Sequence, residues 1–255
     1  MLRRFKVAIL ICSLSVSGLF AKDKETILIY CGITMVNPVK EITTILEKDL
    51  DVKIVMTQGG SADLFNALKT SNTGDIYIPG EERYIKEYKP QGYFEEHMKS
   101  IGYNQAAIFV QKGNPHSVRN LKDLLRTDIS TMLCDYNTGS IGKMTKTILE
   151  NYGGKKFFED AYLNAVEVGT DSRNINAALN KKSIDLAVNW KSTITFADNK
   201  NTIDVIEIDE KYAPKMHIPA ILLKSSKNKD IAKKIIDYMA AKDGQAIMKK
   251  YGFVD

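Results

Sequence analysis

The sequence lacks the features that mark several large classes of protein. Among its 255 residues are only 6 prolines, 16 glycines and 3 cysteines, while 44% of the residues are hydrophobic and 26% are charged. This composition excludes a collagen-like, coiled-coil or disordered chain and is typical of an ordinary folded protein. A chain of this length forms one large domain or two smaller α/β domains, and either can bury a substantial core.

A strong excess of positive charge is also missing once the N-terminus is set aside. The formal net charge is +5, but Arg3, Arg4 and Lys6 supply three of these charges. Without them, Lys+Arg falls from 36 to 33 against 31 Asp+Glu, which leaves +2. Because a nucleic-acid-binding domain usually keeps a clear basic excess, no nucleic-acid partner is expected.

A long apolar segment occurs once, at residues 7–20, directly after the basic residues. This order is the pattern of a secretory signal peptide, and the small residue Ala21 is a suitable cleavage point. The apolar run is shorter than the roughly 20 residues that a membrane-spanning helix needs, which makes an N-terminal anchor the lesser alternative. We therefore expect residues 1–21 to be removed as a signal peptide and the mature protein to be exported to the periplasm.

Motifs for metal binding and catalysis are absent or incomplete. There is no Cys-x-x-Cys, no zinc-ligand spacing, no Gly-x-Ser-x-Gly and no His-Glu-x-x-His. Residues 139–143 are similar to the end of a phosphate-binding P-loop, but Asn137 stands at the first glycine position and Met144 replaces the magnesium-binding Ser or Thr. The three histidines lie in polar surroundings and are expected on the surface without a carboxylate partner. We predict no catalytic residue, no metal and no cofactor.

Predicted strands and helices alternate along the whole chain, which indicates α/β layers with parallel strands. Strands are expected at residues 26–31, 52–57, 75–78, 106–111, 130–134, 184–190, 205–208 and 218–223. Helices are expected from about residues 37, 61, 82, 121 and 174, after the loop at 135–142 (ending at 153–154), and as one terminal helix at 229–249. In open α/β sheets, ligands bind where the strands end at their carboxyl ends.

Three turns with glycine and hydroxyl side chains precede predicted helices, and they occur in both halves of the chain. They are Gly32-Ile33-Thr34, Gly59-Gly60-Ser61 and Thr138-Gly139-Ser140. Free backbone N–H groups and the positive end of the helix dipole favour an anion at such turns. Plain N-capping would explain any one turn, and Asp63 adds an unfavourable negative charge. Several turns at strand ends nevertheless favour convergence on one ligand.

Arg173 and Trp190 are two further candidates for a site. Arg173 lies at the start of a helix that Asp171-Ser172 is expected to cap, where its charge opposes the helix dipole. It could fork onto an oxyanion or carboxylate ligand, or instead point to solvent or pair with Asp171 or Asp185. Trp190, the only tryptophan, ends the strand 184–190 and is expected either in the core or on a cleft wall.

Taken together, these features resemble the extracytoplasmic solute-binding proteins of ABC importers, most of all the molybdate/tungstate-type oxyanion binders. The resemblance covers nearly all of residues 26–255 in element order. Its motifs are the turns at residues 31–37 and 59–61, the strand at 74–77, two crossover segments at 101–106 and 218–220, and the C-terminal helix end at 249–253.

This resemblance implies a two-lobed α/β fold of the periplasmic-binding-protein type (class II), with a ligand cleft between two mainly parallel sheets. Lobe I would contain residues 22–103 and 211–255, and lobe II residues 104–210. The family's hydroxyl turns imply that Thr34 and Ser61 bind the ligand. With the turns discussed above, the full set of expected ligand-binding residues is Thr34, Ser61, Thr138, Gly139, Ser140, Ser172, Arg173 and Trp190.

Two departures from the family pattern leave the ligand open. Glycines precede Ser61 where serines are usual, and Asn189-Trp190 stands where a tyrosine is usual. The segment Asp171-Ser172-Arg173 together with Trp190 is more similar to colonisation-factor and adhesin-like proteins that hold organic or phosphorylated anions.

The expected function is therefore capture of an anion, molybdate or tungstate first, by a monomer that delivers it to an ABC permease in the inner membrane. The alternatives are a binder of a phosphate- or carboxylate-bearing organic anion with an adhesin role, and a secreted hydrolase, for which a catalytic dyad is missing. Cys31 and Cys134 would end strands in opposite lobes. We expect both to be free thiols, because a disulfide between them would clamp the lobes shut.

Overall fold

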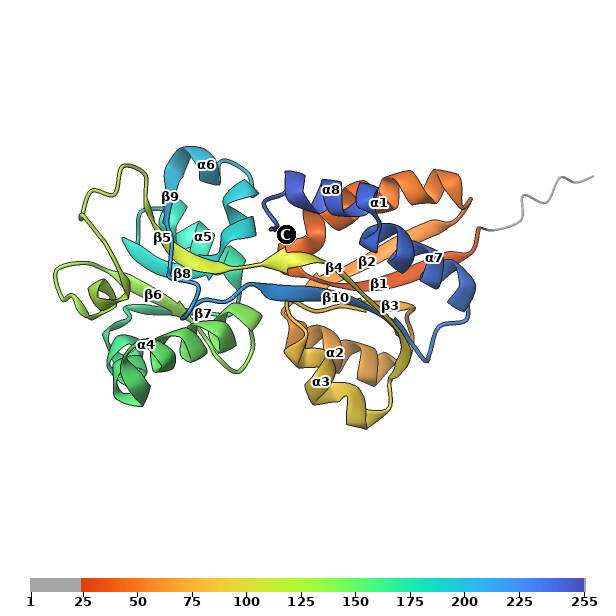
Figure 1. Ribbon diagram of the computed structural model, residues 1–255, viewed down its shortest axis with the longest axis horizontal. Helices are drawn as coiled ribbons and strands as arrows, with labels where there is room; N and C mark the ends of the chain where they lie inside the picture. The colour runs from red at the N-terminus through yellow and green to blue at the C-terminus, as the bar shows by residue number, and fades with distance from the viewer. Residues whose placement is uncertain (1–23, 255) are drawn as a thin grey trace, which may run out of the picture.

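The computed structural model describes residues 24–254 and forms two lobes side by side, each built on one five-stranded sheet (Figure 1). The predicted signal peptide lies outside the described residues. Within residues 24–254, no helix combines the length and apolar character that crossing a membrane would require.

The sheet of lobe I is formed by the N-terminal strands and by two strands from later in the chain. Its order is β2 (Lys53–Gly59), β1 (Thr26–Gly32), β3 (Ile76–Ile78), β10 (Met216–Leu223) and β4 (Phe94–Asn104). Its helices are α1 (Val36–Asp49), α2 (Ser61–Ser71), α3 (Arg83–Tyr88), α7 (Lys229–Ala240) and α8 (Lys242–Lys250). In Figure 1, α2 and α3 cover one face of the sheet while α1, α7 and α8 cover the other.

The sheet of lobe II has the order β7 (Glu167–Gly169), β6 (Thr131–Cys134), β8 (Leu186–Trp190), β5 (Ala106–Gln111) and β9 (Ile203–Ile206). Its helices are α4 (Ser140–Asn164), α5 (Ser172–Asn180) and the short α6 (Asn199–Thr202). Four 3-10 helices complete the described chain: η1 (Ile33–Met35), η2 (Lys89–Gln91), η3 (Leu121–Leu125) and η4 (Lys191–Thr195).

Both sheets are mixed rather than mainly parallel, which differs from the prediction. In lobe I, β1 pairs in parallel with β2 and β3, whereas β10 is antiparallel to β3 and β4. In lobe II, β6 is parallel to β7 and β8, whereas β5 is antiparallel to β8 and β9. The chain passes between the lobes after β4 and again before β10 (Figure 1). The strands that adjoin these crossings, β4, β5 and β10, form the antiparallel pairs. The lobe boundaries at 103/104 and 210/211 stay a prediction.

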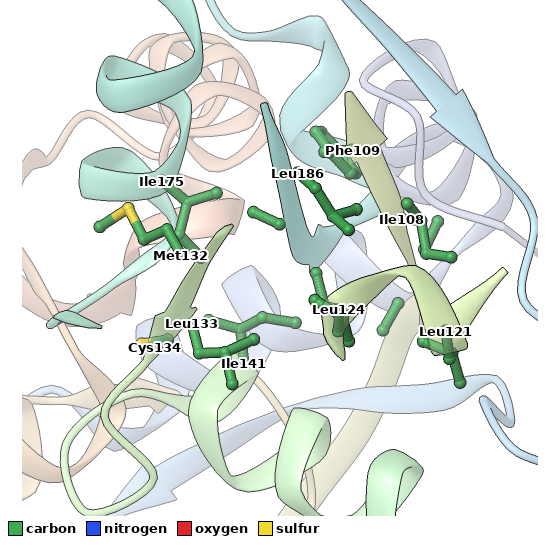
Figure 2. Packing of buried hydrophobic residues seen from close by; sticks show 14 of the residues in the cluster. Ile108, Phe109, Leu121, Leu124, Met132, Leu133, Cys134, Ile141, Ile175 and Leu186 are labelled. Carbon is green, nitrogen blue, oxygen red and sulfur yellow. The ribbon is translucent and has the colours of Figure 1, made fainter. Parts of the chain in front are cut away.

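Each lobe has its own hydrophobic core, as the continuous apolar strands predict. The first five residues of β5 are all buried, which suits a central strand covered on both faces. Figure 2 shows this core: Ile108 of β5 and Leu186 of β8 lie on the side of Leu121 and Leu124 of η3, while Phe109 of β5 points away from them. This packing of strand and helix side chains holds the sheet of lobe II in place, including the edge from which its turns lead towards lobe I.

Three helices differ from their predicted form. The segment 121–125 is a 3-10 helix that starts with a capping box at Asn120. Helix α4 continues past its predicted end to Asn164, with a kink at Gly154, whose φ of 82° suits glycine. The predicted terminal helix is two helices, because the backbone of Ala241 is extended, with ψ of 170°.

Two leucines in lobe II provide a matched test of where the core lies. Leu186 is 0% exposed in β8, whereas Leu163 at the end of α4 is 84% exposed. We expect Leu186→Ala to lower the free energy of unfolding by about 2–5 kcal/mol, because it leaves a cavity. Leu163→Ala should change it by about 0.5 kcal/mol at most. Urea denaturation of both variants measures this, and equal losses would contradict the assignment of the core.

Candidate functional site

A small pocket lies where the two lobes meet, at the carboxyl ends of the strands of both sheets. It is narrow, and small residues form most of its lining. Lobe I contributes Gly32, Ile33, Thr34, Gly59, Gly60, Ser61 and Gly80, and lobe II contributes Gly139, Ser140, Ile141, Asp171 and Ser172. The three turns singled out in the sequence therefore meet at one place.

Several helices point their N-termini at this pocket. Helix α2 begins after Gly60, α4 after Gly139, and η1, which leads directly into α1, after Gly32. No side chain caps these three N-termini. The first N–H groups of a helix have no intrahelical acceptor, and together with the helix dipole they create a positive end. The pocket is thus a place where backbone donors need an acceptor.

Ser61 and Ser140 present hydroxyl groups to the pocket from opposite lobes. The Ser61 Oγ accepts a hydrogen bond from the backbone N–H of Gly80 at 2.9 Å, and the Ser140 Oγ accepts one from the indole Nε1 of Trp190 at 3.0 Å. Neither an amide N–H nor an indole N–H can accept in return. Each hydroxyl proton must therefore be donated elsewhere, and the pocket lies beside both.

Close contact between the lobes depends on a glycine at position 80. A Cβ atom placed on Gly80 would collide with the Ser140 hydroxyl group of lobe II and would lie 3.4 Å from the Ser61 Oγ. Farther from the pocket, Lys143 Nζ of α4 donates to Glu87 Oε2 of α3 at 2.9 Å and lies 4.6 Å from the centre of the Tyr84 ring. The structure thus has the lobes closed on each other.

Three further residues are predicted at the site, Thr34, Thr138 and Ser172, and two of them line the pocket. Thr34 and Ser172 are lining residues, and the Thr34 hydroxyl contacts Met35 Sδ at 2.8 Å. Thr138 is not among the lining residues, because its hydroxyl donates to the carbonyl oxygen of Thr170 at 3.2 Å. A hydrogen bond to the segment before α5, 32 residues along the chain, therefore holds the Thr138 side chain.

The structure does not place Arg173 in the pocket lining, in contrast to the prediction. Its guanidinium pairs with Asp171, with Nη2 at 2.7 Å and Nε at 3.2 Å from Oδ2, and the side chain is 51% exposed. Asp171 itself lines the pocket and caps α5, accepting from the Arg173 backbone N–H at 2.7 Å. Among the described residues, the pocket lining contains no lysine or arginine. Arg173 instead compensates the charge of Asp171, the acidic residue in the described pocket lining.

Trp190 is fully buried and packs in the core of lobe II, so it is not a cleft wall. Its contribution to the pocket is the hydrogen bond to Ser140. Sequence reasoning did not select Gly80 as a pocket residue, although it follows the predicted strand 75–78. The rule that ligands bind at the carboxyl ends of strands could have identified it.

The histidines have carboxylate partners, contrary to expectation. His97 Nε2 lies 3.0 Å from Asp237, His116 Nε2 lies 3.1 Å from Asp185, and His217 Nδ1 lies 3.4 Å from Glu82. Partners far away in sequence form these pairs, so local sequence could not identify them. None of the three histidines lines the pocket, and within residues 24–254 no group of three or more His, Cys, Asp or Glu side chains could hold a metal ion.

Both remaining cysteines are free and buried, one in each lobe. Cys31 is in β1, and Cys134 ends β6 beside the pocket turn that contains Gly139, whose added Cβ would lie 2.9 Å from the Cys134 Sγ. Burial raises the pKa of the Cys31 thiol and raises the pKa of the Cys134 thiol to about 12. Both are therefore poor nucleophiles while the protein is folded.

Known proteins are similar to this chain over most of its length. The family model described as bacterial extracellular solute-binding protein matches residues 27–254. A Haemophilus influenzae protein described as a binding protein is 21% identical over 235 residues, covering 92% of this chain and 93% of the relative.

Solved structures give the same picture of the fold. The substrate-binding domain of a molybdenum ABC transporter from Clostridium difficile is 22% identical with a TM-score of 0.67, covering 90% of this chain and 98% of that one. PEB3 from Campylobacter jejuni, solved with L-phospholactate, is 19% identical with a TM-score of 0.73, covering 90% and 99%. The predicted two-lobed α/β fold is confirmed.

The free thiols lead to a prediction for a protein that begins after Ala21, whose cysteines are Cys31 and Cys134. Denatured without reduction, it should release two thiols per chain to a colorimetric thiol reagent. The native protein should react far more slowly, because both groups are buried and protonated. Absence of titratable thiols after denaturation would contradict the assignment and indicate a disulfide.

Proposed function

We propose that this chain, which belongs to the bacterial extracellular solute-binding protein family, captures a small oxyanion, molybdate or tungstate first, in the pocket between its lobes. The family is one of binding proteins, so the expectation that the chain is not an enzyme is confirmed. The observation that carries the proposal is the convergence of uncapped helix N-termini and two oriented serine hydroxyls on one pocket.

The charge of the pocket supports a dianion. Each helix N-terminus is equivalent to about half a positive charge, so the starts of α1, α2, α4 and α5 together supply on the order of two charges. The capped start of α5 contributes less, because Asp171 already occupies it. A compact tetrahedral anion suits a narrow pocket lined mostly by glycine and serine, because it can accept hydrogen bonds on all sides. The molybdenum transporter domain among the similar structures supports molybdate as the first choice.

Closure of the lobes would complete the site. In an open form, the Ser61 turn and the Ser140 turn would each offer only half of the donors, and an anion would bridge them. A solute that binds the closed form better shifts the population towards it. A micromolar site needs only about −8 kcal/mol, which a handful of charge-assisted hydrogen bonds can supply.

A second candidate ligand is a small organic anion that bears a phosphate or carboxylate group. The pair Asp171–Arg173 at the pocket rim supports it, because a half-exposed guanidinium can also meet a second anionic group. The structure of PEB3 with L-phospholactate is the parallel among similar proteins. An adhesin role would accompany this alternative.

The remaining parts of the proposal concern place and partners. The N-terminal sequence pattern and the family support export to the periplasm and delivery of the anion, by a monomer, to an ABC permease in the inner membrane.

A ligand screen with the wild type and two variants tests the proposed site. Molybdate, tungstate or sulfate should raise the melting temperature of the wild type with concentration. Gly80→Ala should abolish this shift, because its Cβ would collide with Ser140 and block closure. Leu163→Ala, at an exposed position of α4 outside the pocket lining, is the control and should keep the shift. Shifts by sugars or divalent cations alone, or a shift retained in Gly80→Ala, would contradict the proposal.

The pair Asp171–Arg173 gives a second test. If Arg173 acts by compensating Asp171, Arg173→Ala should weaken anion binding about three- to tenfold, on the order of 1 kcal/mol. Adding Asp171→Asn should restore the affinity, because asparagine keeps the helix cap and removes the charge that Arg173→Ala leaves unpaired. Calorimetric titration of the single and double variants measures this. If Arg173 instead contacts the anion directly, the loss should be larger and the double variant should stay weak.

A further inference from the structure

Glu81 is a buried carboxyl group that the ligand site leaves unexplained. It follows the pocket residue Gly80, between β3 and α3, and its side chain is 0% exposed. Arg83 Nε lies 3.5 Å from Glu81 Oε1, but neither carboxyl oxygen has a hydrogen-bond partner among the described residues. A buried carboxylate without such partners is costly.

The surroundings of Glu81 come from both lobes. Three groups of α3 are close enough to affect the charge of Glu81: Arg83, Tyr84 and Glu87. The Tyr84 hydroxyl group is buried and, like the carboxyl oxygens, has no hydrogen-bond partner among the described residues. From α4 of lobe II, the Lys143 ammonium group also affects the charge of Glu81, while it bonds Glu87 and covers the Tyr84 ring.

The neighbouring acid Glu82 faces a different set of groups. Its carboxylate pairs with Lys86 at 2.9 Å and His217 at 3.4 Å, and it is 28% exposed. Glu82 thus provides a comparison at the next position in the chain: an acid of the same kind that stays paired and in contact with water.

Contacts from lobe II surround the segment that contains Glu81. Ser140 of α4 packs on Gly80, and Lys143 of α4 contacts Tyr84 and Glu87, so residues on both sides of Glu81 in the chain touch lobe II. Separation of the lobes would remove these contacts, and we expect it to let water reach the carboxyl group. The group can then ionise in the open form at little cost, whereas the closed form favours the protonated acid.

We propose that Glu81 couples closure of the lobes to the uptake of one proton, so that the protein holds its solute more tightly at lower pH. This inference rests on the proposed function, because it takes closure around a solute as the binding event. The direction follows from the buried position of the carboxyl group and its lack of hydrogen-bond partners, since protonation removes the charge that closure would otherwise bury.

The pH range follows from the ionisation of Glu81 in the two forms. In the closed form, burial raises the pKa of Glu81 to about 7, although the charges of Arg83 and Lys143 lower it. An exposed glutamate has a pKa of about 4.3. Closure therefore takes up a proton mainly between these two values. Affinity should fall by up to about tenfold for each pH unit across this window and level off above about pH 7.

Calorimetric titration with molybdate at about pH 5.5 and about pH 8 tests the proposal. Wild type should bind about 10- to 30-fold more tightly at the lower pH. Glu81→Gln, which keeps the shape but cannot ionise, should bind equally at both. Glu82→Gln is the matched control and should keep the wild-type dependence. A wild-type affinity that is the same at both pH values, or a pH dependence retained in Glu81→Gln, overturns the proposal.

A second measurement without solute separates this inference from the proposed ligand. Spin labels on exposed positions of α2 and α4 report the distance between the lobes by pulsed electron paramagnetic resonance. The closed fraction of wild type should be larger at about pH 5.5 than at about pH 8, and that of Glu81→Gln should not change. If molybdate does not bind but this difference is seen, the oxyanion assignment fails and the proton coupling stands. A closed fraction that does not depend on pH in wild type overturns the coupling itself.

Discussion

Backbone N–H groups at the starts of helices need acceptors, and this requirement organises the site. In each lobe, strands end at the edge that faces the other lobe, and helices begin directly after them. Glycine rather than a capping side chain precedes α2 and α4, so their first N–H groups stay free on the side facing the other lobe. Two lobes that close on each other therefore bring unsatisfied donors together, and an anion is the group that satisfies donors from both.

The serine hydroxyls add direction to this general preference. A hydroxyl group can rotate, but at Ser61 and Ser140 an N–H group already donates to the oxygen. The donor comes from a different element in each case: the turn after β3 for Ser61 and the end of β8 for Ser140. The core of lobe II, which fixes Trp190, thereby fixes the hydroxyl that the pocket uses. Packing and recognition are connected here through one hydrogen bond.

Local sequence was sufficient for much of the fold and for part of the pocket. Apolar strands followed by glycine and hydroxyl turns placed Ser61 and Ser140 correctly at helix starts, because strand ends and N-caps are determined within a few residues. Arg173 shows the limit: sequence left ligand and Asp171 as alternative partners, and the structure has the aspartate. The indole bond of Trp190 spans 50 residues, and the partner of His97 is 140 residues away. Such contacts depend on the three-dimensional arrangement, which periodicity and spacing do not encode.

A binding protein of this kind must make closure conditional on its solute. Some contacts favour the closed form by themselves, as the bond between Lys143 and Glu87 does, but Glu87 is 45% exposed and the contribution of the pair is small. Other features oppose closure of the empty protein: free N–H groups would be brought together, and Glu81 would lose its water without gaining a hydrogen bond. An anion removes the first penalty by accepting from both lobes, and a proton removes the second. The closed form is thus stable when the site is filled and costly when it is empty, which allows the same contacts both to hold a solute and to release it.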